Sequence, residues 1–179
     1  VFLAGYTAAI RVDGLAIIPI VNLGNAVSTF VAQNAGAGKI DRIPKGYHVG
    51  LTAGIGFGLF VGIMMQLFGN EMIGLFMDAN DAAASIEIGA KYIEIVSIFY
   101  FIFAMMNMSS AVLRGTGDML VFTLAAFANL VVRVSLTYAF AAATAGMVIM
   151  WANPVGWATS FTISFIRYKM GKWKNIQLI

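Results

Sequence analysis

The chain has 179 residues, of which 60% are hydrophobic and 11% charged, and its formal net charge is +3. Soluble domains are about 45–50% apolar and about 25% charged, so a water-soluble fold of this length could not bury so much apolar surface. The absence of cysteine excludes disulfides, thiolate metal sites and cysteine nucleophiles. The composition therefore predicts a protein whose surface faces lipid.

Charged residues fall into clusters, and the apolar stretches between them approach the roughly 20 residues that cross a bilayer as a helix. We predict an all-α membrane protein with five membrane-spanning helices, at 6–33, 47–77, 86–113, 119–142 and 147–168. Pro19 and Pro154 each remove a backbone hydrogen bond, so they are expected to bend the first and the fifth helix.

The second predicted helix carries a glycine at every fourth position, namely Gly50, Gly54, Gly58 and Gly62. Small residues repeated on one face allow two membrane helices to approach closely. This glycine face is expected either to pack tightly against a neighbouring helix or to let the two helices rock against each other.

The charges of the connections predict the orientation in the membrane, because basic residues stay in the cytoplasm during insertion. The connection 36–45, Arg114 and the tail after the fifth helix are basic, whereas the second connection is acidic and the fourth is uncharged. The first and third connections and the C-terminus are therefore predicted to be cytoplasmic. Five crossings then place Val1 outside, and further helices are expected upstream of it.

Polar residues inside a membrane span are costly, and they are candidates for function. Those that we expect to face a substrate cavity are Asn22, Asn25, Asn107, Asn129 and Arg133. Arg133 is the charge deepest in the membrane, at the predicted depth of Asp13 and Glu94. Arg133 is expected to form an ion pair with Asp13 or Glu94, and this pair would act either as a fixed brace or as a gate. No metal site, catalytic residue or nucleotide-binding signature is found, so no enzymatic activity is predicted.

Two connections resemble those of one transporter family. Residues 28–43, Ser-Thr-Phe-Val-Ala-Gln-Asn-Ala-Gly-Ala-Gly-Lys-Ile-Asp-Arg-Ile, resemble the loop after the second helix of the C-terminal lobe in multidrug and toxic compound extrusion (MATE) transporters. Residues 112–118, Val-Leu-Arg-Gly-Thr-Gly-Asp, resemble the loop two helices later, and residues 133–138 look like the helix that follows. The residues of these loop motifs are Gln33, Gly36, Gly38, Arg42, Arg114, Gly115, Gly117 and Asp118.

In physical terms these loops look like helix caps. Gly115 is expected to end its helix in a left-handed conformation, Arg114 to reach carbonyl groups left free at the helix end, and Asp118 to cap the next helix. Gln33 and Asn34 are expected to cap the end of the first helix in a similar way.

The resemblance implies a transporter with two lobes of six helices, of which this chain would be an incomplete C-terminal lobe, in a bacterial cytoplasmic (inner) membrane. Such a protein exports cationic or amphipathic organic compounds by alternating access, driven by H⁺ or Na⁺, and needs no other cofactor. Its partners would be the lipid bilayer and the N-terminal lobe of the same chain, with no nucleic acid. Residues 98–106 contain no acid, so the coupling-ion site is expected in the N-terminal lobe.

Two other functions stay open. A flippase for lipid-linked oligosaccharides has a related helix plan, but it is expected to carry more basic residues in its cavity. A non-transporting membrane bundle, such as an assembly or sensor subunit, would need no cavity at all.

The predicted orientation can be tested in this chain, which has no cysteine of its own. Cysteines introduced at Lys39 and Asp81 should react with a membrane-impermeant thiol reagent from opposite sides of the membrane. Labelling of both positions from one side would contradict the orientation.

Overall fold

The computed structural model describes residues 2–76, 83–144 and 146–175, and in these residues it contains helices and turns but no strand. The predicted all-α fold is therefore confirmed. The elements are α1 (Phe2–Gly36), α2 (Arg42–Gly74), α3 (Ala83–Ser97), α4 (Tyr100–Gly115), α5 (Met119–Phe140), α6 (Val148–Met170) and the 3₁₀ helix η1 (Lys172–Asn175).

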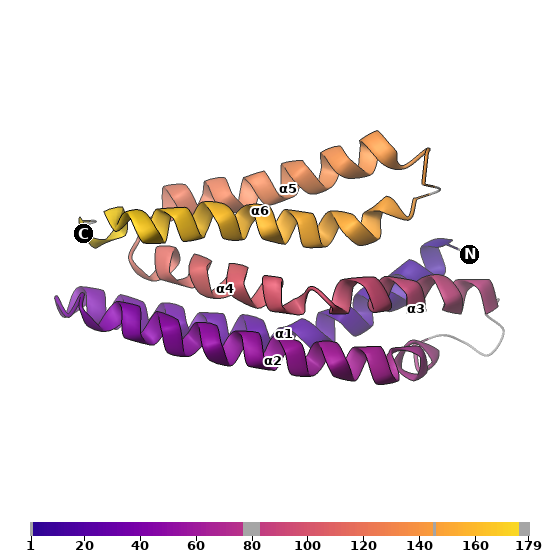
Figure 1. Ribbon diagram of the computed structural model, residues 1–179, viewed down its shortest axis with the longest axis horizontal. Coiled ribbons are helices and arrows are strands. Elements are labelled where there is room, and N and C mark those ends of the chain that lie inside the picture. Colours follow the sequence, from indigo (N-terminus) through magenta and orange to yellow (C-terminus); the bar gives the residue numbers. More distant parts are fainter. Residues whose placement is uncertain (1, 77–82, 145, 176–179) are drawn as a thin grey trace.

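The helices run side by side along one long axis (Figure 1). The first pair, α1 and α2, forms one side of the bundle and the pair α5 and α6 forms the other, with α3 and α4 between them. Helix α4 packs against α1, α2 and α6. Helix α5 packs mainly on α6 and buries only Ala125, so most of its surface is exposed.

Three helices are long and apolar enough to cross a membrane by themselves, namely α1, α2 and α5. Helices α3 and α4 pass the same test only as a pair, with a bend of 55° between them. Helix α6 does not pass this test, although it occupies the position of the fifth predicted span. The described residues therefore contain three candidate spans, or four if the bent pair forms one span, and the fifth crossing stays a prediction.

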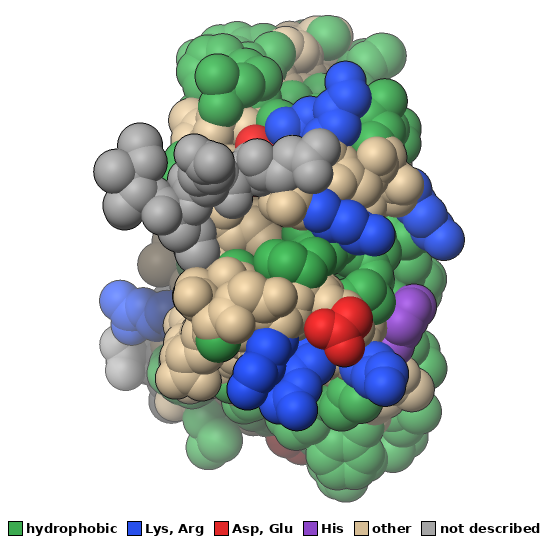
Figure 2. Space-filling model, turned by 90° about the vertical axis from the view of Figure 1, so that its left-hand side faces the viewer, with side chains coloured by type: hydrophobic (Ala, Val, Ile, Leu, Met, Phe, Trp, Pro, Cys, Tyr) green, Lys and Arg blue, Asp and Glu red, His purple; other side chains and the backbone are tan. Residues whose placement is uncertain are grey.

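The charge distribution along the bundle is uneven. Figure 2 looks onto the end where the C-terminus lies, and Lys and Arg side chains gather there, whereas hydrophobic side chains cover the flanks. Lys39, Arg42, Lys45 and Lys169 are exposed. This clustering is the physical basis of the predicted cytoplasmic orientation, which stays a prediction.

The prediction of a single helix at 86–113 is wrong in one respect, because this segment is broken between Ser97 and Tyr100. The backbone N–H of Phe99 donates to the carbonyl of Val96 at 3.0 Å, which closes a tight turn before α4 begins. A break leaves helix carbonyls without their usual partners, which is costly in lipid. Gln66 of α2 compensates, because its Nε2 donates to the carbonyl of Glu94 at 2.6 Å and to Oγ of Ser97 at 2.8 Å.

Gly58 and Gly62 of the glycine face of α2 lie against this break. All four glycines of the predicted face are buried, so its close packing is confirmed. A Cβ atom added to Gly58 would lie 2.9 Å from the carbonyl oxygen of Tyr100, and one added to Gly62 would lie 2.8 Å from that of Ser97. The glycines therefore let α2 approach the backbone of α3 and α4 where the helix is interrupted.

Both prolines lie inside helices, since α1 continues through Pro19 and α6 through Pro154. The expected local bends stay predictions.

Substitution of a glycine on this face should separate α2 from α4. Gly58→Leu should lower the free energy of unfolding by about 1–3 kcal/mol, because the new side chain would meet backbone that cannot move aside. Gly56→Leu is the matched control, since Gly56 is exposed on the same helix and an added Cβ meets nothing within 4 Å. The measurement is thermal unfolding of the purified chain in detergent, and equal losses in the two variants would contradict the packing argument.

Candidate functional site

Asp13 is one of the two buried carboxylates in the described part of the bundle. It lies on the inner face of α1, which also buries Ala9, Val12, Ala16 and Ile20 at helical spacing, and only 8% of it is exposed. The hydroxyl of Tyr100 donates to its Oδ1 at 2.7 Å. Because Tyr100 opens α4 directly after the break, the interruption of the helix determines where this hydroxyl lies.

Tyr92 of α3 is the second hydrogen-bond partner of Asp13. The Nδ2 of Asn153 on α6 donates to the hydroxyl oxygen of Tyr92 at 2.8 Å. Asp13, Tyr92, Tyr100 and Asn153 thus form one buried polar cluster that joins α1, α3, α4 and α6, and we call it the Asp13 cluster. It contains one carboxylate and no basic side chain.

A cavity of about 270 Å³ adjoins this cluster. It is lined by Tyr6, Leu130, Arg133, Val134, Thr137, Tyr138, Ile149, Ala152 and Asn153. The ring of Tyr6 meets the ring of Tyr92 edge-on with 5.4 Å between centroids, so Tyr6 and Asn153 connect the cavity with the Asp13 cluster. Arg133 reaches this place because Gly156 of α6 leaves room for its chain, where an added Cβ would lie 2.7 Å from Cγ of Arg133.

The expected ion pair of Arg133 with Asp13 or Glu94 is not formed as a direct contact. Within the described ranges the one ion pair joins Arg167 and Asp118. Arg133 lies close enough for its charge to act on Asp13 through space, so a brace or gate involving these two residues stays a prediction.

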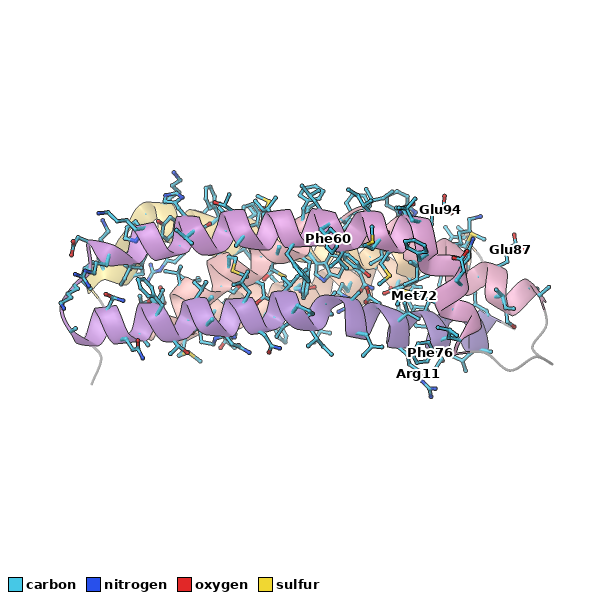
Figure 3. All side chains as sticks on the ribbon, turned by 90° about the horizontal axis from the view of Figure 1, so that it is seen from below. Arg11, Phe60, Met72, Phe76, Glu87 and Glu94 are labelled. Atoms are coloured by element: carbon cyan, nitrogen blue, oxygen red, sulfur yellow. The ribbon has the colours of Figure 1, made fainter. Side chains whose placement is uncertain are left out.

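Glu94 lies elsewhere. It is exposed and lines a groove of about 290 Å³ between α2 and α3, together with Gln66 and Asn70. Residues two positions apart in a helix do not share a face, so Glu94 points away from the cluster to which Tyr92 belongs. Figure 3 likewise shows Arg11, two positions before Asp13, pointing away from the bundle.

The predicted cavity residues divide between different places. Asn22 is exposed, and the exposed Asn25 accepts a hydrogen bond from Nη2 of Arg114 at 3.0 Å. Asn107 packs closely against Gly24, at the contact of α4 with α1. Only Asn129 and Arg133 come together, since both pack on Gly156.

Asn129 carries the one buried side-chain oxygen without a partner among the described residues, its Oδ1. Its Nδ2 has only a long contact, 3.8 Å, with the sulfur of Met106.

The two loop motifs end their helices in the same way. Gly38 has φ +70° and Gly117 has φ +78°. The residue after each glycine donates its N–H to the carbonyl five positions earlier, Lys39 to Asn34 and Asp118 to Leu113, both at 2.8 Å. This bond pattern with a left-handed glycine is the Schellman cap.

The cap expectations for individual residues need correction. The left-handed residue of the second loop is Gly117 and not Gly115, which instead leaves room for Ser28 and Val31 of α1. The side chain of Asp118 makes no cap bond and pairs with Nε of Arg167 at 2.6 Å. Arg114 donates to Oγ of Ser28 at 3.2 Å and to Asn25, so it links α4 to α1.

The remaining motif residues line the surface of the first loop. Gln33, Gly36 and Arg42 are exposed, and the capping by Gln33 side-chain atoms stays a prediction. The Nδ2 of Asn34 donates to the carbonyl of Phe30 at 2.8 Å, so Asn34 does bind a carbonyl of the last turns of α1.

Sequence reasoning missed Tyr92, Tyr100 and Asn153 as site residues. A tyrosine in an apolar span is equally compatible with a place at the membrane interface. Tyr100 and Asp13 are separated by 87 positions, so the sequence alone gives no sign that their side chains meet in the fold.

The chain matches a known protein family. The family model MatE matches residues 1–139. The chain is 28% identical to "Probable multidrug resistance protein YpnP" of Bacillus subtilis (strain 168) over 98% of its own length and 39% of that protein. It is 27% identical to "Probable multidrug resistance protein YoeA" of the same organism over 98% of this chain and 38% of the relative.

A third relative is "Probable multidrug resistance protein NorM" of Thermotoga maritima, 28% identical over 65% of this chain and 25% of the relative. The chain thus spans about two fifths of the length of the first two relatives. No solved structure matches the chain with significance.

Removal of one hydroxyl should weaken the Asp13 cluster. Tyr100→Phe leaves a buried carboxylate oxygen without its donor and should lower the free energy of unfolding at neutral pH by about 1–3 kcal/mol. Tyr138→Phe is the control for the same chemical change, because Tyr138 is 84% exposed. Thermal unfolding in detergent measures both, and an unchanged Tyr100→Phe variant would show that the hydrogen bond contributes nothing.

Proposed function

Since the chain belongs to the MATE family of efflux transporters, we propose that it forms part of a transporter that expels several kinds of organic compound from the cell. The chain spans about two fifths of its first relatives, so it would work together with a second lobe. The names of these relatives refer to multidrug resistance. We propose that the exported compounds are cationic or amphipathic, as the resemblance implies.

The observation that supports transport best is the Asp13 cluster. The outer surfaces of α1, α2 and α5 carry many exposed large apolar side chains, as lipid-facing helices do. Placing a carboxylate inside such a bundle is costly, and intramembrane carboxylates with polar partners typically belong to ion or substrate pathways. A bundle that only held itself together would be more stable with apolar residues there.

The fold also offers elements that could move. Alternating access in transporters is largely rocking of one helix bundle against another, often with interrupted helices near the binding site. The break between α3 and α4 adjoins Asp13 through Tyr100, and the glycine face of α2 lies on the other side of the break. We propose that this motion is driven by H⁺ or Na⁺, which enters the cell while the organic compound leaves it.

The cavity composition weighs against the flippase alternative. Arg133 is the single basic residue among those that line the cavity beside the Asp13 cluster. A carrier of lipid-linked oligosaccharides has to hold anionic phosphate groups and is expected to present several basic side chains to them. We therefore favour a drug exporter over a flippase, and we propose that the whole protein lies in the bacterial cytoplasmic membrane with the C-terminus of this chain inside.

Arg133 should be essential for export in the whole protein. Arg133→Ala removes a positive charge that acts on Asp13 through space, and it should abolish dye efflux driven by a cation gradient in cells that lack other efflux pumps. Lys172→Ala is the control, because Lys172 is an exposed basic residue in η1 at the end of the bundle. Expression is checked for each variant by blotting of the membrane fraction.

Arg133→Lys separates the two possible roles of this side chain. A gate that needs only positive charge should retain most of the efflux, whereas a brace that packs on Gly156 should not. Normal efflux by Arg133→Ala at normal expression would overturn both roles.

A further inference from the structure

We propose that Asp13 is a reversible proton-binding site within this chain, and that its protonation loosens the contact of α1 with the broken helix formed by α3 and α4. The role of this proton in export depends on the proposed function, whereas its binding does not. From the sequence we expected the coupling-ion site in the N-terminal lobe. A proton site at Asp13 would instead lie in the part of the protein that this chain forms.

The two buried acids among the described residues have different partners. Asp118 is 5% exposed and Asp13 is 8% exposed. Asp118 is held by the guanidinium of Arg167 at 2.6 Å, in a pair whose charge is fixed. Asp13 is held by hydroxyl groups and has no basic residue in contact with it. A carboxylate whose direct partners are neutral can gain a proton without leaving an opposite charge unpaired beside it.

The hydrogen bonds of the Asp13 cluster point toward the carboxylate. Asn153 donates to the oxygen of Tyr92, so the hydroxyl proton of Tyr92 is free to be donated to Asp13. Tyr100 also donates to Asp13. The cluster thus directs two donors at one ionised carboxylate, which is the arrangement that the charged form requires.

Protonation changes this arrangement in a definite way. A proton from water forms an O–H bond with a carboxylate oxygen of Asp13, and the side chain becomes neutral. That oxygen then donates instead of accepting, so one tyrosine hydroxyl has to turn its own proton away. The remaining hydrogen bonds are no longer assisted by charge and are about half as strong. The link from α1 to the first residue of α4 is therefore weaker in the protonated state.

The ionisable groups that face Asp13 come from each neighbouring helix. They are Tyr6 of α1, Tyr92 of α3, Tyr100 of α4 and Arg133 of α5, while α6 contributes the amide of Asn153. Arg133 is the single cation among these groups, and it also lines the cavity that Tyr6 and Asn153 connect with Tyr92. This cavity is the route by which a proton would reach the cluster.

The test uses infrared difference spectroscopy on the intact chain in lipid, with the aspartate carboxyl carbon isotope-labelled. Protonated carboxyl groups absorb apart from ionised ones, and the label separates aspartate from glutamate. We expect a labelled acid band that changes reversibly with pH, accompanied by a tyrosine band with the same midpoint. Asp13→Asn should lose both changes, and Tyr100→Phe should reduce the tyrosine change.

Two variants of other aspartates serve as controls for the assignment of the band to Asp13. Asp41→Asn removes an exposed aspartate and Asp118→Asn removes the other buried one, and the acid band that depends on Asp13 should persist in both. If Asp13→Asn does not fold, as judged by circular dichroism, Asp13→Glu serves instead, because its acid band should move to the unlabelled position.

Three outcomes would overturn the proposal. The pH-dependent band could persist in Asp13→Asn or fail to shift in Asp13→Glu, it could be absent from the wild-type chain, or sodium at constant pH could abolish it. The last result would identify a sodium site. A band that titrates as expected in a protein without efflux would leave the proton site intact and reject the proposed function.

Discussion

The structure depends on one constraint, which is that backbone hydrogen-bonding groups must find partners inside the protein when the surroundings are lipid. The interruption between Ser97 and Tyr100 is where the described chain comes closest to violating it. Helix α2 helps to satisfy the constraint with an amide, since Gln66 donates to the carbonyl of Glu94, and its glycines let α2 lie close to the backbone of Ser97 and Tyr100. The interruption is therefore held in place by contacts with α2.

The polar residues of the bundle serve two different purposes. At the end where the basic residues gather, Arg114 ties α4 to α1 and Arg167 ties α6 to Asp118, and both contacts use a guanidinium group that does not change its charge. The loop motifs therefore hold helix ends together. Deeper in the bundle, Asp13 is surrounded by hydroxyl and amide groups, so its charge can change without breaking an ion pair.

The sequence predicted what depends on spacing and composition. The clusters of charge separated the helices, and the repeat of Gly50, Gly54, Gly58 and Gly62 identified the packing face of α2. It did not predict the break, because Ile98 and Phe99 are apolar and the break has no glycine or proline to mark it. It also did not predict the partner of Asp13, because predicted depth alone paired that acid with Arg133, whereas the bend brought Tyr100 to it.

Tyr100 joins the broken helix both to α2 and to α1. The carbonyl of Tyr100 lies against Gly58 of α2, and its hydroxyl donates to Asp13 of α1. On the side of α2 the contact is made by backbone and glycine, which carry no ionisable group. On the side of α1 it is made by a carboxylate whose strength as an acceptor depends on its charge. The proposed change of charge at Asp13 would therefore weaken the contact of the broken helix with α1 and leave its contact with α2 unchanged.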